Sequence, residues 1–487
     1  MRKPLRILLV SFALTSCLGG SFQTSEEKAY ENFWDDATRI QVELTMAQDL
    51  LSALQTFGRE KNDQYNDYYF PASLRITVNE TLYELDDVGI RQKGNIYSRG
   101  SFLDDVGFQF QAFHFRMSFD QTFDETFYGS LGIQKTWMNG EPAYEARQAR
   151  RFFGMKSLEF KWNRSNDPSL INQVYASQLF LNHDAIAPKS TLAKVSLITE
   201  QQGHDVGMYT INEAVDKIFI ERHFSGAAAD GDLYKALWSN QLKLADMADY
   251  SNVIGDYVFR SDKVGIEDTE AFYHPVYDLK TNQQTSQHAS LMKLVKTLST
   301  LNTESSVDRQ KELLNEVVEV ESFLRYAAIS YLSGNPDDMR NLTNNTYIYF
   351  HGVTGQAYFI PYDMDWSLGV TWDPSLTENM ATHSPLDNRD SFDLLIDNPL
   401  YWYTILDGFV TQANRYPRIP GYQSTYLNEV QDVFNQPFFS IEAYDTLFRT
   451  KQALYASDTF TLPSNSTFMN TDLFAYHHQG MVTANPS

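Results

Sequence analysis

Hydrophobic residues follow two different periodicities along the chain, and the change between them predicts an α+β fold. In residues 26–57 they recur every three or four positions, which is typical of one face of a helix. From residue 72 onward they alternate with polar residues, as in strands, over the stretches 74–78, 83–92, 108–119 and 156–162. We therefore predict an N-terminal helix within residues 26–60, followed by a strand-rich half.

The second half of the chain is predicted to be mainly helical. Its clearest pattern runs from Leu313 to Tyr331, and Gly334 followed by Pro336 predicts where that helix ends. Shorter helices are predicted at 167–182, at 214–223 and within 384–415. Two hairpins are predicted, one from strands 192–198 and 208–211 and one from strands 346–351 and 356–362.

The first residues have the features of an export signal. A basic start with Arg2, Lys3 and Arg6 precedes a short apolar stretch, residues 7–15, which is too short to span a bilayer. Residues 14–17, which end in Cys17, resemble the bacterial lipobox, whose cysteine is acylated. The resemblance implies a signal peptide at 1–16, a tether at 17–25 and a lipid anchor on Cys17 in the bacterial cell envelope, at the inner or the outer membrane. A soluble signal peptide with an incidental cysteine is the alternative.

Composition narrows the possible functions. The chain has 487 residues, with 62 acidic and 39 basic side chains and a formal net charge of −23. Such a charge opposes binding to nucleic acid, which is itself a polyanion. Cys17 is the only cysteine, so an intramolecular disulfide and a CxxC zinc site are both excluded.

Acids and amides gather on both flanks of the second predicted hairpin. Those before it are Asp337, Asp338, Asn344 and Asn345, and those after it are Asp363 and Asp365. A hairpin returns the chain to its starting point, so we expect these six side chains to converge. Carboxylate and amide oxygens suit Mg²⁺ or Mn²⁺ better than zinc.

Protein kinases have the same order of groups: a catalytic Asp, an Asn a few residues later, a pair of strands and a metal-binding Asp. Phosphoryl transfer needs one carboxylate to orient the attacking hydroxyl and other oxygens to hold metal against the phosphates. Asp and Asn also cap turns in ordinary loops, and the order alone leaves both interpretations open.

Five segments resemble the CotH family of spore-coat kinases, in the family's order. They are residues 88–95, 212–216, 231–235, 318–324 and 335–369, the last containing the sequence Ile-Pro-Tyr-Asp-Met-Asp. The resemblance implies an atypical kinase-like fold of two lobes with ATP and Mg²⁺ or Mn²⁺ between them. The β-rich N-lobe would span 61–240 and the helical C-lobe 241–463, with a loose tail at 464–487.

The resemblance also implies roles for individual residues. Asp338 would be the catalytic Asp that orients the acceptor hydroxyl, with Asp337 as the second choice, while Asp363 and Asn344 or Asn345 would bind metal with support from Asp365. The turn Lys93-Gly94-Asn95 would face the nucleotide. Glu213 and Lys235 would form a charge pair in the cleft, unless Lys235 is a solvated surface lysine.

The implied activity is transfer of the ATP γ-phosphoryl group to Ser or Thr hydroxyls of an envelope or secreted protein. The alternative is a catalytically silent, pseudokinase-like scaffold that binds envelope protein or glycan. Two departures from the family pattern support that alternative. Where the family often has a lysine, the segment 113–119 offers Arg116 and His114, and the insertion 136–151 has no assigned role.

Overall fold

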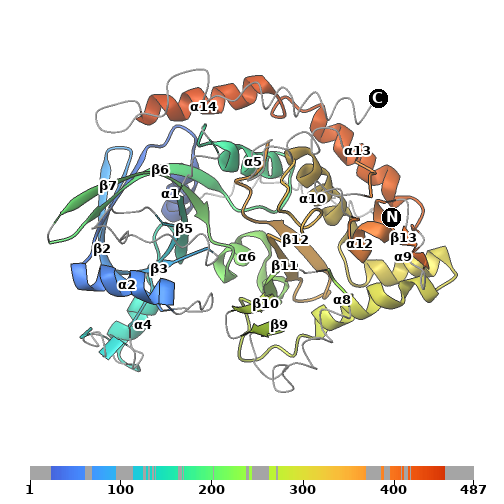
Figure 1. Ribbon diagram of the computed structural model, residues 1–487, viewed down its shortest axis with the longest axis horizontal. Helices are drawn as coiled ribbons and strands as arrows, with labels where there is room; N and C mark the ends of the chain where they lie inside the picture. Colours follow the sequence, from blue (N-terminus) through green and yellow to red (C-terminus); the bar gives the residue numbers. More distant parts are fainter. Residues whose placement is uncertain are drawn as a thin grey trace, which may run out of the picture.

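The computed structural model (Figure 1) confirms the mixed α+β class. It describes residues 24–60, 68–94, 113–123, 128–129, 132–133, 137, 139–162, 167, 169–200, 202–236, 241–243, 263–269, 272–368, 385–388, 395–406, 409–410, 415–416 and 418–455. Residues 1–16, Cys17, Asn95 and the tail 464–487 lie outside these ranges, so the predictions made for them stay predictions.

The N-terminal strands close into a barrel, which the sequence did not predict. Its strands are β1 (Ile40–Thr45), β2 (Phe70–Val78), β3 (Thr81–Gln92), β4 (Phe115–Ser118), β5 (Ser157–Trp162), β6 (Ser190–Ile198) and β7 (Gly203–Glu213). They are ordered β1-β2-β3-β4-β5-β7-β6, and a parallel pairing of β1 with β6 closes the ring. The predicted strands within β2, β3 and β5 and the first hairpin, β6–β7, are confirmed.

The single N-terminal helix predicted within residues 26–60 is wrong. The chain forms α1 (Ser25–Trp34), then β1, then α2 (Gln48–Glu60). Ile40, Val42 and Leu44 alternate, and their side chains fill the barrel core. Ile40 and Leu44 fit a helical spacing equally well. It is therefore the pairing of this segment with β2 and β6 that makes it a strand.

The C-terminal half is built on a second sheet of five strands. These are β8 (Leu233–Ala236), β9 (Lys263–Thr269), β10 (Phe272–Leu279), β11 (Thr346–Phe350) and β12 (Ala357–Pro361), in the order β12-β11-β8-β10-β9. The predicted second hairpin is confirmed as β11–β12, with Thr346 opposite Pro361. The sheet strand β8 lies within residues 61–240, so the second sheet draws on both halves of the chain.

Helices lie around this sheet, from the middle of Figure 1 to its right side and along its top. They include α5 (Asn172–Leu181), α6 (Lys217–His223), α8 (Ala289–Thr300), α12 (Pro399–Thr404), α13 (Tyr422–Phe434) and α14 (Ile441–Tyr455), while α4 (Pro142–Gln148) lies in the 136–151 insertion on the barrel side. α5 begins at Asn172 rather than Asp167. The Asp167 carboxylate accepts from the backbone N–H groups of Ser169 and Asn172, so it orders the turn before the helix.

The long helix predicted from Leu313 to Tyr331 is interrupted. A short extended segment separates α9 (Val307–Asn315) from α10 (Val320–Ser333). In that segment Val317 and Glu319 exchange backbone hydrogen bonds with Ala357 of β12, at 2.8 and 3.1 Å. The predicted end is correct, because Gly334 caps α10 with a φ of 64°.

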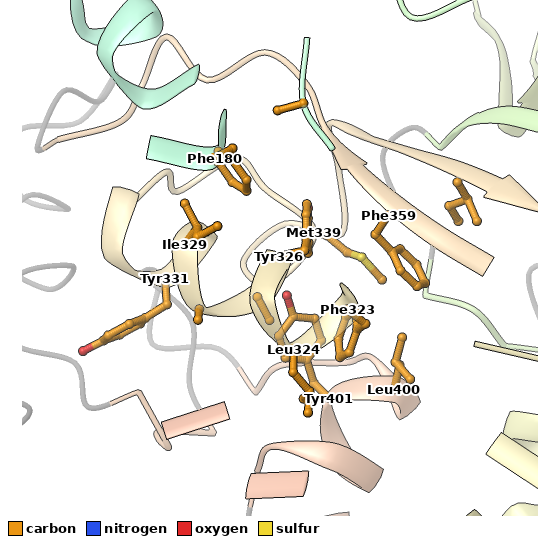
Figure 2. Packing of buried hydrophobic residues seen from close by; sticks show 14 of the residues in the cluster. Phe180, Phe323, Leu324, Tyr326, Ile329, Tyr331, Met339, Phe359, Leu400 and Tyr401 are labelled. Atoms are coloured by element: carbon orange, nitrogen blue, oxygen red, sulfur yellow. The ribbon is translucent and has the colours of Figure 1, made fainter. Parts of the chain in front are cut away.

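Two large cores lie on either side of the molecule. One fills the barrel, and the other packs α10 against β12, α5 and α12, as Figure 2 shows. In the second core the Phe323 ring lies 5.2 Å from the Phe359 ring and 5.3 Å from that of Tyr401, both in edge contact. Although α5 lies between β5 and β6 in sequence, its side chains belong to this second core.

The last helix joins the two cores. α14 runs along the top of Figure 1 above α5. The hydroxyl of Tyr455 accepts from the Ile40 N–H at 3.0 Å and donates to the Leu192 carbonyl at 2.7 Å. Lys451, which is fully buried, donates to Thr191 Oγ1 at 3.0 Å. These contacts hold the barrel against the helical half, and therefore fix the outer face of the barrel relative to the β11–β12 hairpin.

Candidate functional site

The two flanks of the β11–β12 hairpin converge as the sequence predicted. Tyr362 follows β12 and donates its backbone N–H to the Asn345 carbonyl at 3.1 Å. Asn335, just after α10, donates its amide to the Asp363 carbonyl at 3.2 Å. We call the group formed here by Asp337, Asn344, Asn345, Asp363 and Asp365 the hairpin base.

The backbone of the hairpin base is unusual. Thr343, Asn345, Asp363 and Leu368 all have positive φ angles, between 49° and 60°. Non-glycine residues rarely adopt this left-handed region, at a cost of about 1 kcal/mol or more each. Such a cluster persists only where the surrounding packing imposes it, and it aims the side chains on both flanks.

Asp337 and Asp338 are neighbours in sequence but have different surroundings. The Asp337 carboxylate faces the hairpin base, where it accepts from the side-chain amides of Asn344 and Asn345, each at 2.9 Å. Both amide groups point their nitrogens at Asp337, so their oxygens are available to a cation. Burial raises the pKa of Asp337 to about 7, and repulsion from Asp363 and Asp365 adds to this despite the two amide hydrogen bonds.

Asp338 faces into its own loop instead. Its carboxylate accepts from the Ser330 hydroxyl of α10 and from the backbone and side-chain amides of Asn341, both at 2.8 Å. Its side chain is 5% exposed, and burial raises its pKa. These contacts are those of a residue that orders a loop, and they leave Asp337 as the carboxylate directed toward the other acids.

Three lysines surround the acids from other elements. Lys161 of β5 forms ion pairs with Asp363 and, at 2.8 Å, with Asp365. Lys93, at the end of β3, is hydrogen-bonded to the Tyr362 hydroxyl. Lys93 and Lys235 both lie over the Tyr362 ring, 4.6 and 4.3 Å from its centre. Lysines and acids from distant parts of the chain therefore lie together at the hairpin base.

The charged groups on the barrel side come from the outer faces of its strands. Leu158 and Phe160 point into the barrel core, so Glu159 and Lys161 point outward. Glu159 forms ion pairs with Lys93 and, at 4.0 Å, with Arg116 of β4. Our sequence reasoning missed Glu159 and Lys161, although their alternation with Leu158 and Phe160 was a usable signal.

The remaining predicted residues have mixed outcomes. The proposed pair of Glu213 with Lys235 is wrong, because the Glu213 carboxylate is buried against the Tyr30 hydroxyl and the Arg222 guanidinium, at 2.7 and 2.9 Å. Lys235 is half-buried rather than solvated. Gly94 has a φ of 99°, which favours glycine at the turn after Lys93.

Burial and neighbouring charges set the pKa values of the lysines and acids. Burial alone would raise the pKa of Asp363, but Lys161, Lys93 and Lys235 outweigh it and hold the pKa below its usual range. Burial and the charge of Lys93 lower the pKa of Lys235 to about 7. The site therefore combines an acid whose pKa is lowered, Asp363, with a lysine whose pKa is also lowered, Lys235.

Glu159 should make the stability of the protein sensitive to acid. Burial alone would raise its pKa, but Lys93, Arg116 and Lys235 hold it at about 2 instead of the ordinary 4.5. A pKa lowered by folding stabilises the protein above about pH 4.5, by about 3 kcal/mol at most, and this contribution is lost as the pH falls toward 2. We expect Glu159→Gln to be less stable than wild type at pH 7, with the gap narrowing at pH 3.5, in urea unfolding.

The matched control is Glu84→Gln, since Glu84 is 65% exposed and pairs with Arg75 on the barrel surface. Its effect should stay below about 1 kcal/mol at both pH values. A gap between wild type and Glu159→Gln that is equally large at pH 7 and pH 3.5 would contradict the role given to this carboxylate.

The carboxylate and amide oxygens of the hairpin base suit a hard divalent cation, but its carboxylates alone do not form a metal site. Among the described residues, no group of three or more His, Cys, Asp or Glu side chains is placed to hold a metal ion. A cation would therefore need an Asn oxygen beside the carboxylates, and carboxylate and amide oxygens together suit Mg²⁺ or Mn²⁺. The ammonium group of Lys161 lies between Asp363 and Asp365 in this structure.

A buried cavity elsewhere has no comparable chemistry. It lies in the barrel beside α2 and is lined by apolar side chains such as Leu51, Phe115 and Val195. None of the predicted site residues lines it. Within the ranges that the structure describes, no helix has the length and apolar character needed to cross a membrane.

Comparison with known proteins agrees with the sequence resemblance. The sequence model of a family described as CotH kinase protein matches residues 119–454. This range contains β5–β12, α10 and every residue of the hairpin base. No curated protein matches the chain.

Proposed function

Because the chain belongs to the CotH kinase protein family, we propose that it transfers the γ-phosphoryl group of ATP to a Ser or Thr hydroxyl of an envelope or secreted protein. The observation that supports this most is the meeting of three lysines with the acids and amides of the hairpin base. Phosphoryl transfer depends mainly on positioning and on charge stabilisation, and this arrangement offers both.

The residues around the hairpin base divide naturally between the phosphates and the acceptor. Lys93 and Lys235, which both lie close to the Tyr362 ring, would bind phosphate oxygens, and Glu159 would hold Lys93 in place as its ion-pair partner. Asp363 and an Asn oxygen from Asn344 or Asn345 would hold Mg²⁺ or Mn²⁺, with Asp365 in support. A divalent ion bound there would offset the negative charge of the phosphates.

Asp337 is the better candidate for orienting the acceptor hydroxyl. Its carboxylate faces the other acids, whereas that of Asp338 is occupied by Ser330 and Asn341. A raised pKa also suits a group that takes a proton as the hydroxyl attacks. We therefore assign the catalytic role to Asp337 and a structural one to Asp338.

A silent scaffold is the second candidate, and one observation favours it. Lys161 already forms ion pairs with both Asp363 and Asp365, so the fold can keep these acids in place without metal. In that case the chain would bind an envelope protein or glycan, and its acids would serve stability alone.

Labelled ATP separates the two candidates. We expect the purified full chain, incubated with γ-labelled ATP and Mn²⁺ or Mg²⁺, to transfer label to Ser or Thr of itself or of envelope proteins. EDTA should abolish the transfer, because the phosphates lose their counter-cation. Absence of both transfer and ATP binding, measured by equilibrium dialysis, would reject the kinase and support the scaffold.

A further inference from the structure

One ammonium group bridges two carboxylates at the hairpin base. Lys161 Nζ is ion-paired with Asp363 and lies 2.8 Å from Asp365 Oδ1. The Lys161 side chain is 17% exposed, and those of the two acids are 33% and 30% exposed. Since β5 points Phe160 into the barrel core, alternation directs Lys161 outward to this place.

The Lys161 bridge reduces the repulsion among the acids of the hairpin base. Asp337, Asp363 and Asp365 repel one another, and repulsion from the latter two raises the pKa of Asp337. A cation between Asp363 and Asp365 relieves that repulsion. A divalent ion could do the same, but it would then be repelled by Lys161 and by Lys93 and Lys235 nearby.

We infer that Lys161 is a built-in counter-cation that competes with divalent metal for Asp363 and Asp365. The inference rests on the metal role given to Asp363 in the proposed function. Metal alone binds weakly, since it must displace the ammonium group. Phosphates that arrive with the metal give the displaced Lys161, together with Lys93 and Lys235, a negative partner. Lys161 is thus a positioning residue that couples metal binding to nucleotide binding.

Mn²⁺ binding without nucleotide tests the competition. In Lys161→Met the neutral side chain no longer competes, so we expect the affinity for Mn²⁺ to rise at least about tenfold, measured by calorimetry or by the electron-spin signal of free Mn²⁺. Lys161→Arg keeps the charge and should bind Mn²⁺ as wild type does. An unchanged or weaker affinity in Lys161→Met overturns the inference, as does failure of both proteins to bind Mn²⁺ at millimolar concentration.

Lys156→Met is the matched control, because Lys156 lies just before β5 and pairs with Asp120 at 3.2 Å. Its Mn²⁺ affinity should equal that of wild type. A second measurement needs no variant. In the wild-type protein, Mn²⁺ should increase the chemical acetylation of Lys161 relative to that of Lys156, and mass spectrometry measures both. Equal or reduced acetylation of Lys161 contradicts displacement, even if Lys161→Met fails to fold.

The two proposals can fail separately. Tighter Mn²⁺ binding in Lys161→Met without phosphoryl transfer in the wild type would remove the kinase function and leave the competition standing. Phosphoryl transfer in the wild type with equal Mn²⁺ affinities would remove the competition and leave the kinase function.

Discussion

Asp363→Asn is expected to lower phosphoryl transfer by at least about 10²–10³-fold, the loss usual when one preorganised charge at a reacting centre is removed. The lysine contacts keep Asp363 ionised, and its place next to Tyr362, which bonds to Asn345, sets it at the hairpin base. An amide has the same size but no charge, so it would hold a divalent ion poorly. The measurement is the initial rate of label transfer from ATP at saturating Mn²⁺.

The control for this variant is Asp205→Asn. Asp205 also pairs with a buried lysine, Lys194, at 2.8 Å, but in the β6–β7 hairpin of the barrel. Its transfer rate should match that of wild type within about twofold, because Asp205 lies in the barrel and is not one of the residues of the hairpin base. If Asp363→Asn kept more than a tenth of the wild-type rate while remaining folded, the metal role of Asp363 would have to be abandoned.

The hairpin base could be predicted from sequence because its geometry is local. Two strands joined by a short turn bring their ends together whatever the rest of the chain does, so Asn344 and Asn345 had to lie near Asp363. Asp337 joins them through its hydrogen bonds with both Asn side chains. The same argument could not separate Asp337 from Asp338. Which of two adjacent carboxylates faces the site depends on the backbone after α10, and that backbone is fixed by Ser330 and Asn341.

The partners from the barrel depend on contacts far apart in sequence. Lys161 meets Asp363 across 202 positions, and Lys93 meets Tyr362 across 269. Neither meeting follows from local periodicity, because it requires β1 to close the barrel and α14 to hold the barrel against the second core. The mistaken pairing of Glu213 with Lys235 has the same cause, since the order of residues gave no information on the competing partners Tyr30 and Arg222.

The second large expected effect distinguishes the roles of the adjacent acids Asp337 and Asp338. Asp337→Ala should lower kcat by about 10²–10⁴-fold, the usual loss on removing a general base. It should change stability less than Asp338→Ala, because Asn345 keeps its hydrogen bond to the Asp337 carbonyl and Asn344 is only half-buried. Asp338→Ala should instead destabilise the fold by about 3 kcal/mol, because the Ser330 and Asn341 donors lose a buried acceptor. Urea unfolding and transfer rates, corrected for the folded fraction, measure both quantities on the same preparations.

Measuring the KM for ATP further distinguishes the roles of Asp337 and Asp338. Asp337 touches the acceptor hydroxyl in the proposed function and no phosphate, so Asp337→Ala should leave the KM for ATP within about threefold of wild type while kcat falls. Folded Asp338→Ala should retain kcat within about tenfold, since its carboxylate points away from the hairpin base. The opposite result would be a folded but inactive Asp338→Ala and an active Asp337→Ala. It would return the catalytic role to Asp338, and the loop after α10 would then have to turn the Asp338 carboxylate toward Asp363.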